Sequence, residues 1–164
     1  MLRHIRSRLG HFGLEVAEDK TRILPIGRYK GTNEEFDFLG FTFYNTKTRR
    51  GTYRLGVRTS KKKLKAKRQM VKQWLKTRLT EPVDGTMKLI AASIRGHSNY
   101  YGVSGNYKAI HDFSDYVMNS TYKMLNRRSQ CKGMKREKFA RMWHHYVSPV
   151  HITCDIWHIT PRTV

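Results

Sequence analysis

Residues 94–130 read IRGHSNYYGVSGNYKAIHDFSDYVMNSTYKMLNRRSQ, and they contain the clearest helical pattern in the chain. A tyrosine-containing segment ends at Gly102 and is followed by a Gly-rich break. From Tyr107 to Arg128, side chains suited to a core then recur at helical spacing, namely Ile110, Phe113, Val117, Thr121 and Met124. The pattern predicts one long amphipathic helix over residues 107–128.

Three more helices are predicted around this one. Ser60 is a suitable N-cap for a helix over residues 61–79, with an apolar stripe of Leu64, Val71, Trp74, Leu75 and Leu79. Asp84 opens a second helix that ends at Gly102 and places on one face Met87, Ile90, Ile94, His97 and Tyr101. Residues 135–146 form a fourth, short helix, and an extended tail begins at Pro149. Amphipathic helices of this kind imply a bundle.

The N-terminal third predicts a different kind of structure. Leu2, Ile5, Leu9 and Phe12 have helical spacing, and Gly13 ends that helix. Short strands are expected at residues 14–16 and 21–26, followed by a polar loop. Alternating residues in 36–43 and 53–58 predict the two arms of a β-hairpin, with residues 45–51 as its turn. The expected fold class is therefore α+β, with a short N-terminal helix and a hairpin before a mainly helical bundle.

The charge indicates the kind of partner. The chain has 33 Lys and Arg against 12 Asp and Glu, a net charge of +21, and six of those acids precede Phe38. Such an excess favours a polyanionic partner. With 38% hydrophobic residues the chain can form a core, so disorder is not expected. Cys131 and Cys154 lack the spacing of a zinc module or a disulfide framework, and no apolar run reaches membrane-spanning length. We expect a cytoplasmic protein.

The strongest candidate for nucleic-acid contact is the helix at 61–79. It carries nine cations and no acid within residues 61–79, and Lys61, Lys65, Lys72 and Lys76 form a stripe beside its apolar face. Like charges at this spacing destabilise a helix, so a solvated face is a less satisfactory explanation than phosphate contact. Cations predicted to bind nucleic acid are Lys61, Lys62, Lys65, Arg68, Lys72 and Lys76, together with Arg127 and Arg128 at the end of the long helix.

The segment from Arg95 to Tyr101 has two interpretations. In one it serves packing, with Gly96 permitting close helix approach and His97 and Tyr101 facing inward. In the other, Arg95, Asn99 and Tyr100 lie on outer faces, where their guanidinium, amide and phenol groups suit RNA sugars, phosphates and unstacked bases. Both remain open at this point.

Nothing in the sequence predicts catalysis or a metal site. There is no pair of adjacent aspartates, and Asp112 and Asp115 are explained as partners of the helix dipole. His144 and His145 have no cysteine or carboxylate at ligand spacing.

Several ordered motifs closely resemble the C-terminal portion of group II intron-encoded reverse transcriptase/maturases. Residues 13–23 are similar to a late palm motif, and residues 37–41 to the hairpin that grips the primer terminus. Residues from Lys61 onward resemble the thumb, residues 95–106 its Arg-Gly-x-x-Asn-Tyr-Tyr signature, and residues 136–149 the end of the maturase domain. The resemblance divides the chain into the end of the palm (1–59), a thumb/maturase bundle (60–130), and the end of domain X with a tail (131–164).

The resemblance also implies function. It adds Lys20, Phe38, Leu39, Gly40 and Arg58 to the expected nucleic-acid contacts, and structured intron RNA as the partner, with an RNA/DNA template-primer as a second ligand. The family's Mg²⁺-binding Tyr-x-Asp-Asp strand would precede Leu2, so we expect no cofactor and no polymerase activity in this chain alone. The first hypothesis is an RNA-binding fragment that assists splicing and, in the full-length family, retrohoming. The alternatives are half of a split reverse transcriptase, completed by an upstream chain or dimer partner, and a decayed remnant.

Overall fold

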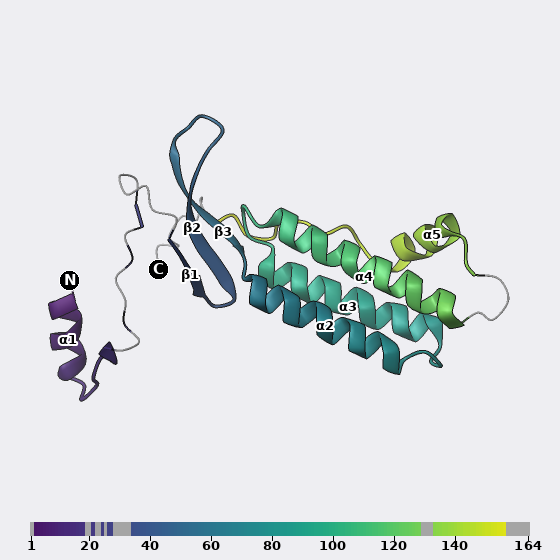
Figure 1. Cartoon of the computed structure of the whole chain (residues 1–164), viewed down its shortest axis with the longest axis horizontal. Coiled ribbons are helices and arrows are strands. Elements are labelled where there is room, and N and C mark those ends of the chain that lie inside the picture. The colour runs from purple at the N-terminus through teal and green to yellow at the C-terminus, as the bar shows by residue number, and fades with distance from the viewer. Residues whose placement is uncertain are drawn as a thin grey trace, which may run out of the picture.

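The structure is a computed structural model that describes residues 2–18, 21, 24, 26–27, 34–128 and 133–156. Its elements are α1 (Leu2–Gly10), β1 (Glu35–Phe38), β2 (Phe41–Lys47), β3 (Tyr53–Thr59), α2 (Lys61–Thr77), α3 (Val83–Tyr101), α4 (Tyr107–Arg128) and α5 (Arg136–Tyr146). Figure 1 shows the sheet at one end of the helical bundle and α1 apart from it. The predicted α+β class is confirmed.

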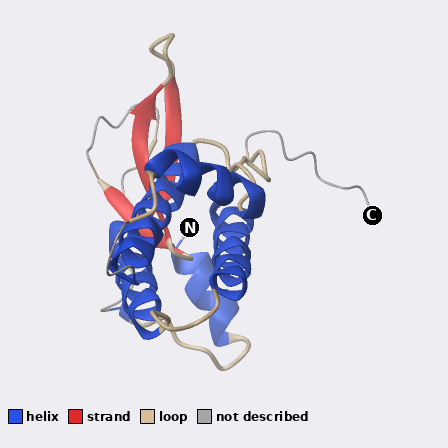
Figure 2. Ribbon diagram, turned by 90° about the vertical axis from the view of Figure 1, so that its right-hand side faces the viewer, coloured by secondary structure: helices blue, strands red, loops and turns tan. Residues whose placement is uncertain are grey.

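The long helix and its core face were predicted correctly. α4 covers residues 107–128, and all five of its predicted inward side chains are buried. α2 and α4 run away from the sheet and α3 runs back toward it (Figure 1). One apolar core joins α2 to α5 and continues past α5 to Val147; its members are Val71, Leu75, Met87, Ile90, Ile94, Phe113, Val117, Met124, Leu125, Phe139, Trp143 and Val147. Figure 2 shows the helices of the bundle nearly end-on.

The predicted hairpin is a three-stranded antiparallel sheet in the order β1-β2-β3. The arm expected over residues 36–43 is divided between two strands, and Phe38 pairs with Phe41 across a turn at Leu39 and Gly40. Both turn residues have positive φ, 49° and 83°. Two successive residues of this conformation match the twist of a tight hairpin. The sequence did not predict this turn, because the apolar residues on both sides of it favour a continuous strand.

Two predicted details of the helices and strands are wrong. Residues 14–16 form no strand, and Leu14 is 57% exposed. α2 ends at Thr77, before Leu79. Ser60 is the N-cap residue of α2, as predicted, but its hydroxyl donates to Asp37 Oδ2 at 2.9 Å and makes no capping hydrogen bond to the helix. Lys20 and Cys131 lie outside the described residues, and the strand expected at 21–26 lies partly outside them.

The C-terminal segment folds back along α3. The backbone N–H groups of Thr153 and Cys154 donate to the carbonyl of Gly102 at 2.7 and 3.0 Å, and Cys154 pairs with Val103 in a parallel bridge. Through these bonds the tail, which was predicted to be extended, covers the junction between α3 and α4. Among the described helices, none is long and apolar enough to cross a membrane.

Candidate nucleic-acid interface

The basic charge of α2 has no acidic counterpart within the helix. Its first turn contains no acid, and none of its lysines forms an ion pair with a described residue. Lys61, Lys65, Lys72 and Lys76 are all exposed. Because like charges along one edge repel each other, this edge of α2 favours contact with an anionic ligand.

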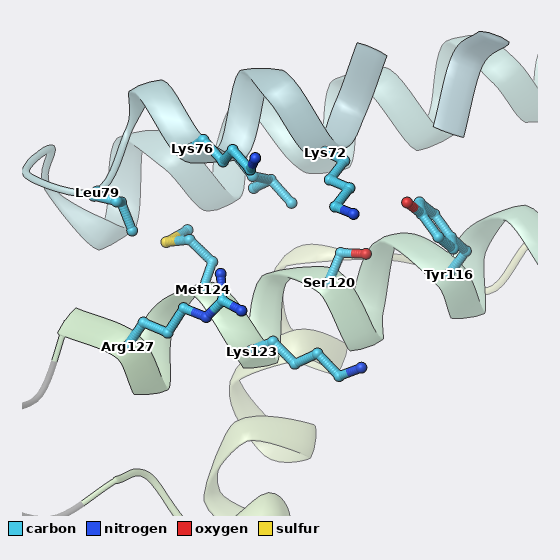
Figure 3. Close-up of a pocket in the computed structure, with 9 residues that line it drawn as sticks. Lys72, Lys76, Leu79, Tyr116, Ser120, Lys123, Met124 and Arg127 are labelled. Carbon is cyan, nitrogen blue, oxygen red and sulfur yellow. The ribbon is translucent and has the colours of Figure 1, made fainter. Parts of the chain in front are cut away.

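One part of this edge forms a wall of a groove between α2 and α4 (Figure 3). Lys72 and Lys76 lie on the α2 side, and Lys123 and Arg127 lie on the α4 side. The same groove is lined by Leu75, Leu79, Tyr116, Ser120 and Met124, and no acid is among these residues. Cations from two helices thus line the same groove.

The opposite edge of α2 faces α3 and forms a second groove. Lys63, Lys67 and Met70 of α2 line it together with small residues of α3 that include Ala92, Ser93 and Gly96, and with Tyr100. A Cβ on Gly96 would meet nothing within 4 Å. The packing role expected for Gly96 is therefore wrong, since this glycine borders open space.

The Arg95 to Tyr101 segment divides between two surfaces. Arg95 and Asn99 are exposed and line a pocket that the C-terminal segment closes through Pro149 and His151. Tyr100 lies on the other side, where its hydroxyl donates to the Leu39 carbonyl at 2.9 Å and its ring stacks on Phe41 at 6.0 Å. Tyr100 thus contacts the hairpin and is 55% exposed, while Arg95 and Asn99 present their polar groups at the surface.

His97 and Tyr101 form the inner side of this segment. The His97 ring lies 4.0 Å from the Phe113 ring and 4.7 Å from the Tyr101 ring, between centroids. Its Nε2 is buried and has no hydrogen-bond partner among the described residues. Burial, with a smaller contribution from Lys67, lowers the pKa of His97 to about 4, so the ring is neutral at physiological pH.

The hairpin turn presents two of its predicted contact residues to solvent. Phe38 and Leu39 are 58% and 67% exposed. Gly40 lies against α3, where a Cβ would come within 2.8 Å of the Tyr101 hydroxyl. Asp37 accepts hydrogen bonds from Thr42 at 2.5 Å and Ser60 at 2.9 Å, and these bonds lower its pKa. The turn is thus held against the bundle with its apolar tip outward.

Two predicted contact arginines have partners within the chain, and a third is partly enclosed. Arg58 pairs with Glu35 and lies over the Tyr44 ring. Arg68 donates to the Asp112 carbonyl at 3.3 Å and lies over the Tyr116 ring. Arg128 is half-buried, with one terminal nitrogen enclosed. Their positions favour structural roles, whereas Arg127 faces the α2/α4 groove.

The sequence did not reveal Lys123 and Ser120 as groove residues, because their place opposite α2 depends on how the helices pack. It also gave no role to Lys63 and Lys67 as members of a second groove. The described residues contain no group of three metal-ligating side chains.

Comparisons with protein-family models, with curated proteins and with solved structures gave no match.

Proposed function

We propose that this chain is an RNA-binding C-terminal portion of a group II intron reverse transcriptase/maturase. It binds structured intron RNA and helps that RNA hold its splicing-competent fold, while the ribozyme performs the chemistry. The ordered sequence motifs support the family, and the observation that carries RNA binding is the uncompensated edge of α2, Lys61, Lys65, Lys72 and Lys76. Reverse transcription would require a catalytic palm with its metal-binding aspartates.

In this proposal, different surface residues provide affinity for RNA and recognition of the intron. Lysines contact phosphates, which are common to all RNA, so α2 provides affinity without sequence preference. Arg95 and Asn99 are exposed four residues apart on α3, on one face of the helix. Their directional donors can distinguish 2′-hydroxyls and unpaired bases, so specificity for intron RNA belongs to this pair.

The test is a pair of titrations at one salt concentration, with a group II intron RNA and with an unrelated structured RNA of equal length. We expect Arg95→Gln to weaken intron binding by about 1–3 kcal/mol through loss of a charge-assisted hydrogen bond, and binding of the unrelated RNA much less. Arg141→Gln, on the exposed side of α5, removes the same charge elsewhere and should affect both RNAs slightly. Thermal melts check that each variant is folded.

Equal losses for the two RNAs with Arg95→Gln, in a folded protein, would identify a basic module without intron specificity. That result would defeat the maturase proposal.

A further inference from the structure

The α2/α4 groove contains more positive charge than the helix dipoles explain. Lys76 and Arg127 lie in the last turns of α2 and α4, where a cation complements the carbonyl end of a helix. Lys72 and Lys123 lie at least one residue before those turns, and the dipole effect falls off within the last turn. All four are placed around one groove without an acid among its lining residues. An anionic ligand would relieve their mutual repulsion.

The groove also has an apolar surface, which a phosphate ion alone would not use. Leu75 and Met124 are buried beneath it, and Leu79 is 41% exposed at its end. Ser120 contributes a hydroxyl, and Figure 3 shows Lys72 reaching from α2 toward this residue on α4. The arrangement suits a ligand that has negative charge on its edges and a less polar surface between them.

Single-stranded RNA has this combination, because its phosphates flank riboses and bases that are free to leave a stack. The groove has a volume of about 280 Å³ and lies between two helices that pack directly on each other. Helices in contact are roughly 8–10 Å apart, so their groove has no room for a duplex. In a duplex, moreover, the bases are stacked and paired inside and cannot reach Leu79.

We propose that the α2/α4 groove is a binding site for single-stranded RNA. Phosphates contact Lys72 and Lys76 on one side and Lys123 and Arg127 on the other, and a ribose or base covers Leu79. This inference rests on the proposed function for its ligand, RNA, but it concerns a surface distinct from the Arg95 and Asn99 pair.

The experiment measures binding of a fluorescent single-stranded RNA oligomer and of the same sequence as a duplex, over a series of salt concentrations. Two double variants remove one wall each, Lys72→Gln with Lys76→Gln, and Lys123→Gln with Arg127→Gln. The matched control is Lys108→Gln with Lys138→Gln, which removes two exposed charges outside the groove. A second pair tests the apolar surface: Leu79→Ser in the groove, and Leu89→Ser on α3 as its control, 41% and 48% exposed.

Each wall variant should weaken single-strand binding on the order of tenfold relative to the control and reduce the salt slope by about 0.7 for each lost phosphate contact. Leu79→Ser should weaken it by roughly threefold or more without changing that slope, whereas Leu89→Ser should not. Duplex binding should change no more in the wall variants than in the control.

Wall variants that match the control, or that weaken duplex and single strand equally, would overturn the groove site. RNA binding by the wild-type chain would persist in that case, so the proposed function would stand. If the wild-type chain bound neither RNA at physiological salt, both proposals would fall.

Discussion

Asn106 joins the sheet to the bundle through its side-chain amide. Its Nδ2 donates to Thr59 Oγ1 and to the Tyr101 carbonyl, and its Oδ1 accepts from the Thr59 backbone N–H, all at 2.8 Å. The side chain is fully buried, so both ends of the amide need these partners. Asn106 therefore fixes where the hairpin lies relative to α3 and α4. Sequence alone gave it no role, because Thr59 is 47 residues away in the chain.

His97 predicts a pH dependence of stability. Its pKa is lowered to about 4 in the fold, against about 6.5 in the unfolded chain, because burial disfavours the charged ring. The contribution of the neutral ring to folding stability is therefore fully present above pH 6.5, and it is lost as the pH falls from 6.5 toward 4. We expect the free energy of unfolding to fall less in His97→Phe than in the wild type between pH 6.5 and pH 4, by on the order of 2 kcal/mol. The measurement is urea unfolding at several pH values.

An unchanged slope of stability against pH in that variant would mean that His97 is accessible to protons in the folded state. His111, exposed on α4, serves as the control position, and His111→Phe should leave the difference between pH 6.5 and pH 4 largely in place.

At the scale of the elements, the sequence predicted those features that depend only on the spacing of neighbouring residues. Five of the six buried residues of α4 were predicted, all but Leu125, because residues three and four apart share a helix face wherever the helix lies. The turn at Leu39 and Gly40 was missed because it needs positive φ at a leucine, which sequence rarely signals. Ser60 is the predicted N-cap residue of α2, but its hydroxyl donates to Asp37, which belongs to a different element, and so makes no capping hydrogen bond.

The attachment of the C-terminal segment to α3 depends on Gly102. A Cβ there would lie 2.3 Å from the Ser98 carbonyl oxygen, 2.9 Å from Thr153 Oγ1 and 3.0 Å from the His151 carbonyl oxygen. We expect Gly102→Ala to destabilise the protein by about 1–3 kcal/mol, since the backbone atoms must shift. Hydrogen exchange should show faster exchange at Thr153 and Cys154, whose N–H groups donate to Gly102.

Gly85→Ala is the matched control for that substitution. It lies in the first turn of α3, where a Cβ would meet nothing within 4 Å, so alanine should be neutral or stabilising by up to about 1 kcal/mol. Equal stability of the two variants, with unchanged exchange at Thr153, would show that the segment is not held at Gly102.

At the scale of the whole molecule, charge could be predicted and its arrangement could not. The sequence indicated a polyanionic partner and the basic edge of α2, since both follow from composition and spacing along one helix. The grooves required knowing that α4 lies on one side of α2 and α3 on the other. For the same reason the sequence did not reveal that Lys123 lines a groove, or that Arg58 and Arg68 each have a partner from another element.

The central claim is that the uncompensated edge of α2 binds RNA phosphates, and the salt dependence of RNA binding tests it most directly. The chain with Lys61, Lys65, Lys72 and Lys76 changed to Gln is compared with one carrying Gln at four other exposed cations, Lys108, Lys135, Lys138 and Arg141. We predict that the α2 variant weakens binding to structured RNAs whatever their sequence and flattens the slope of log K against log salt by about 0.7–0.9 per lost contact. A slope unchanged from wild type, or flattened equally in both variants, would contradict the claim.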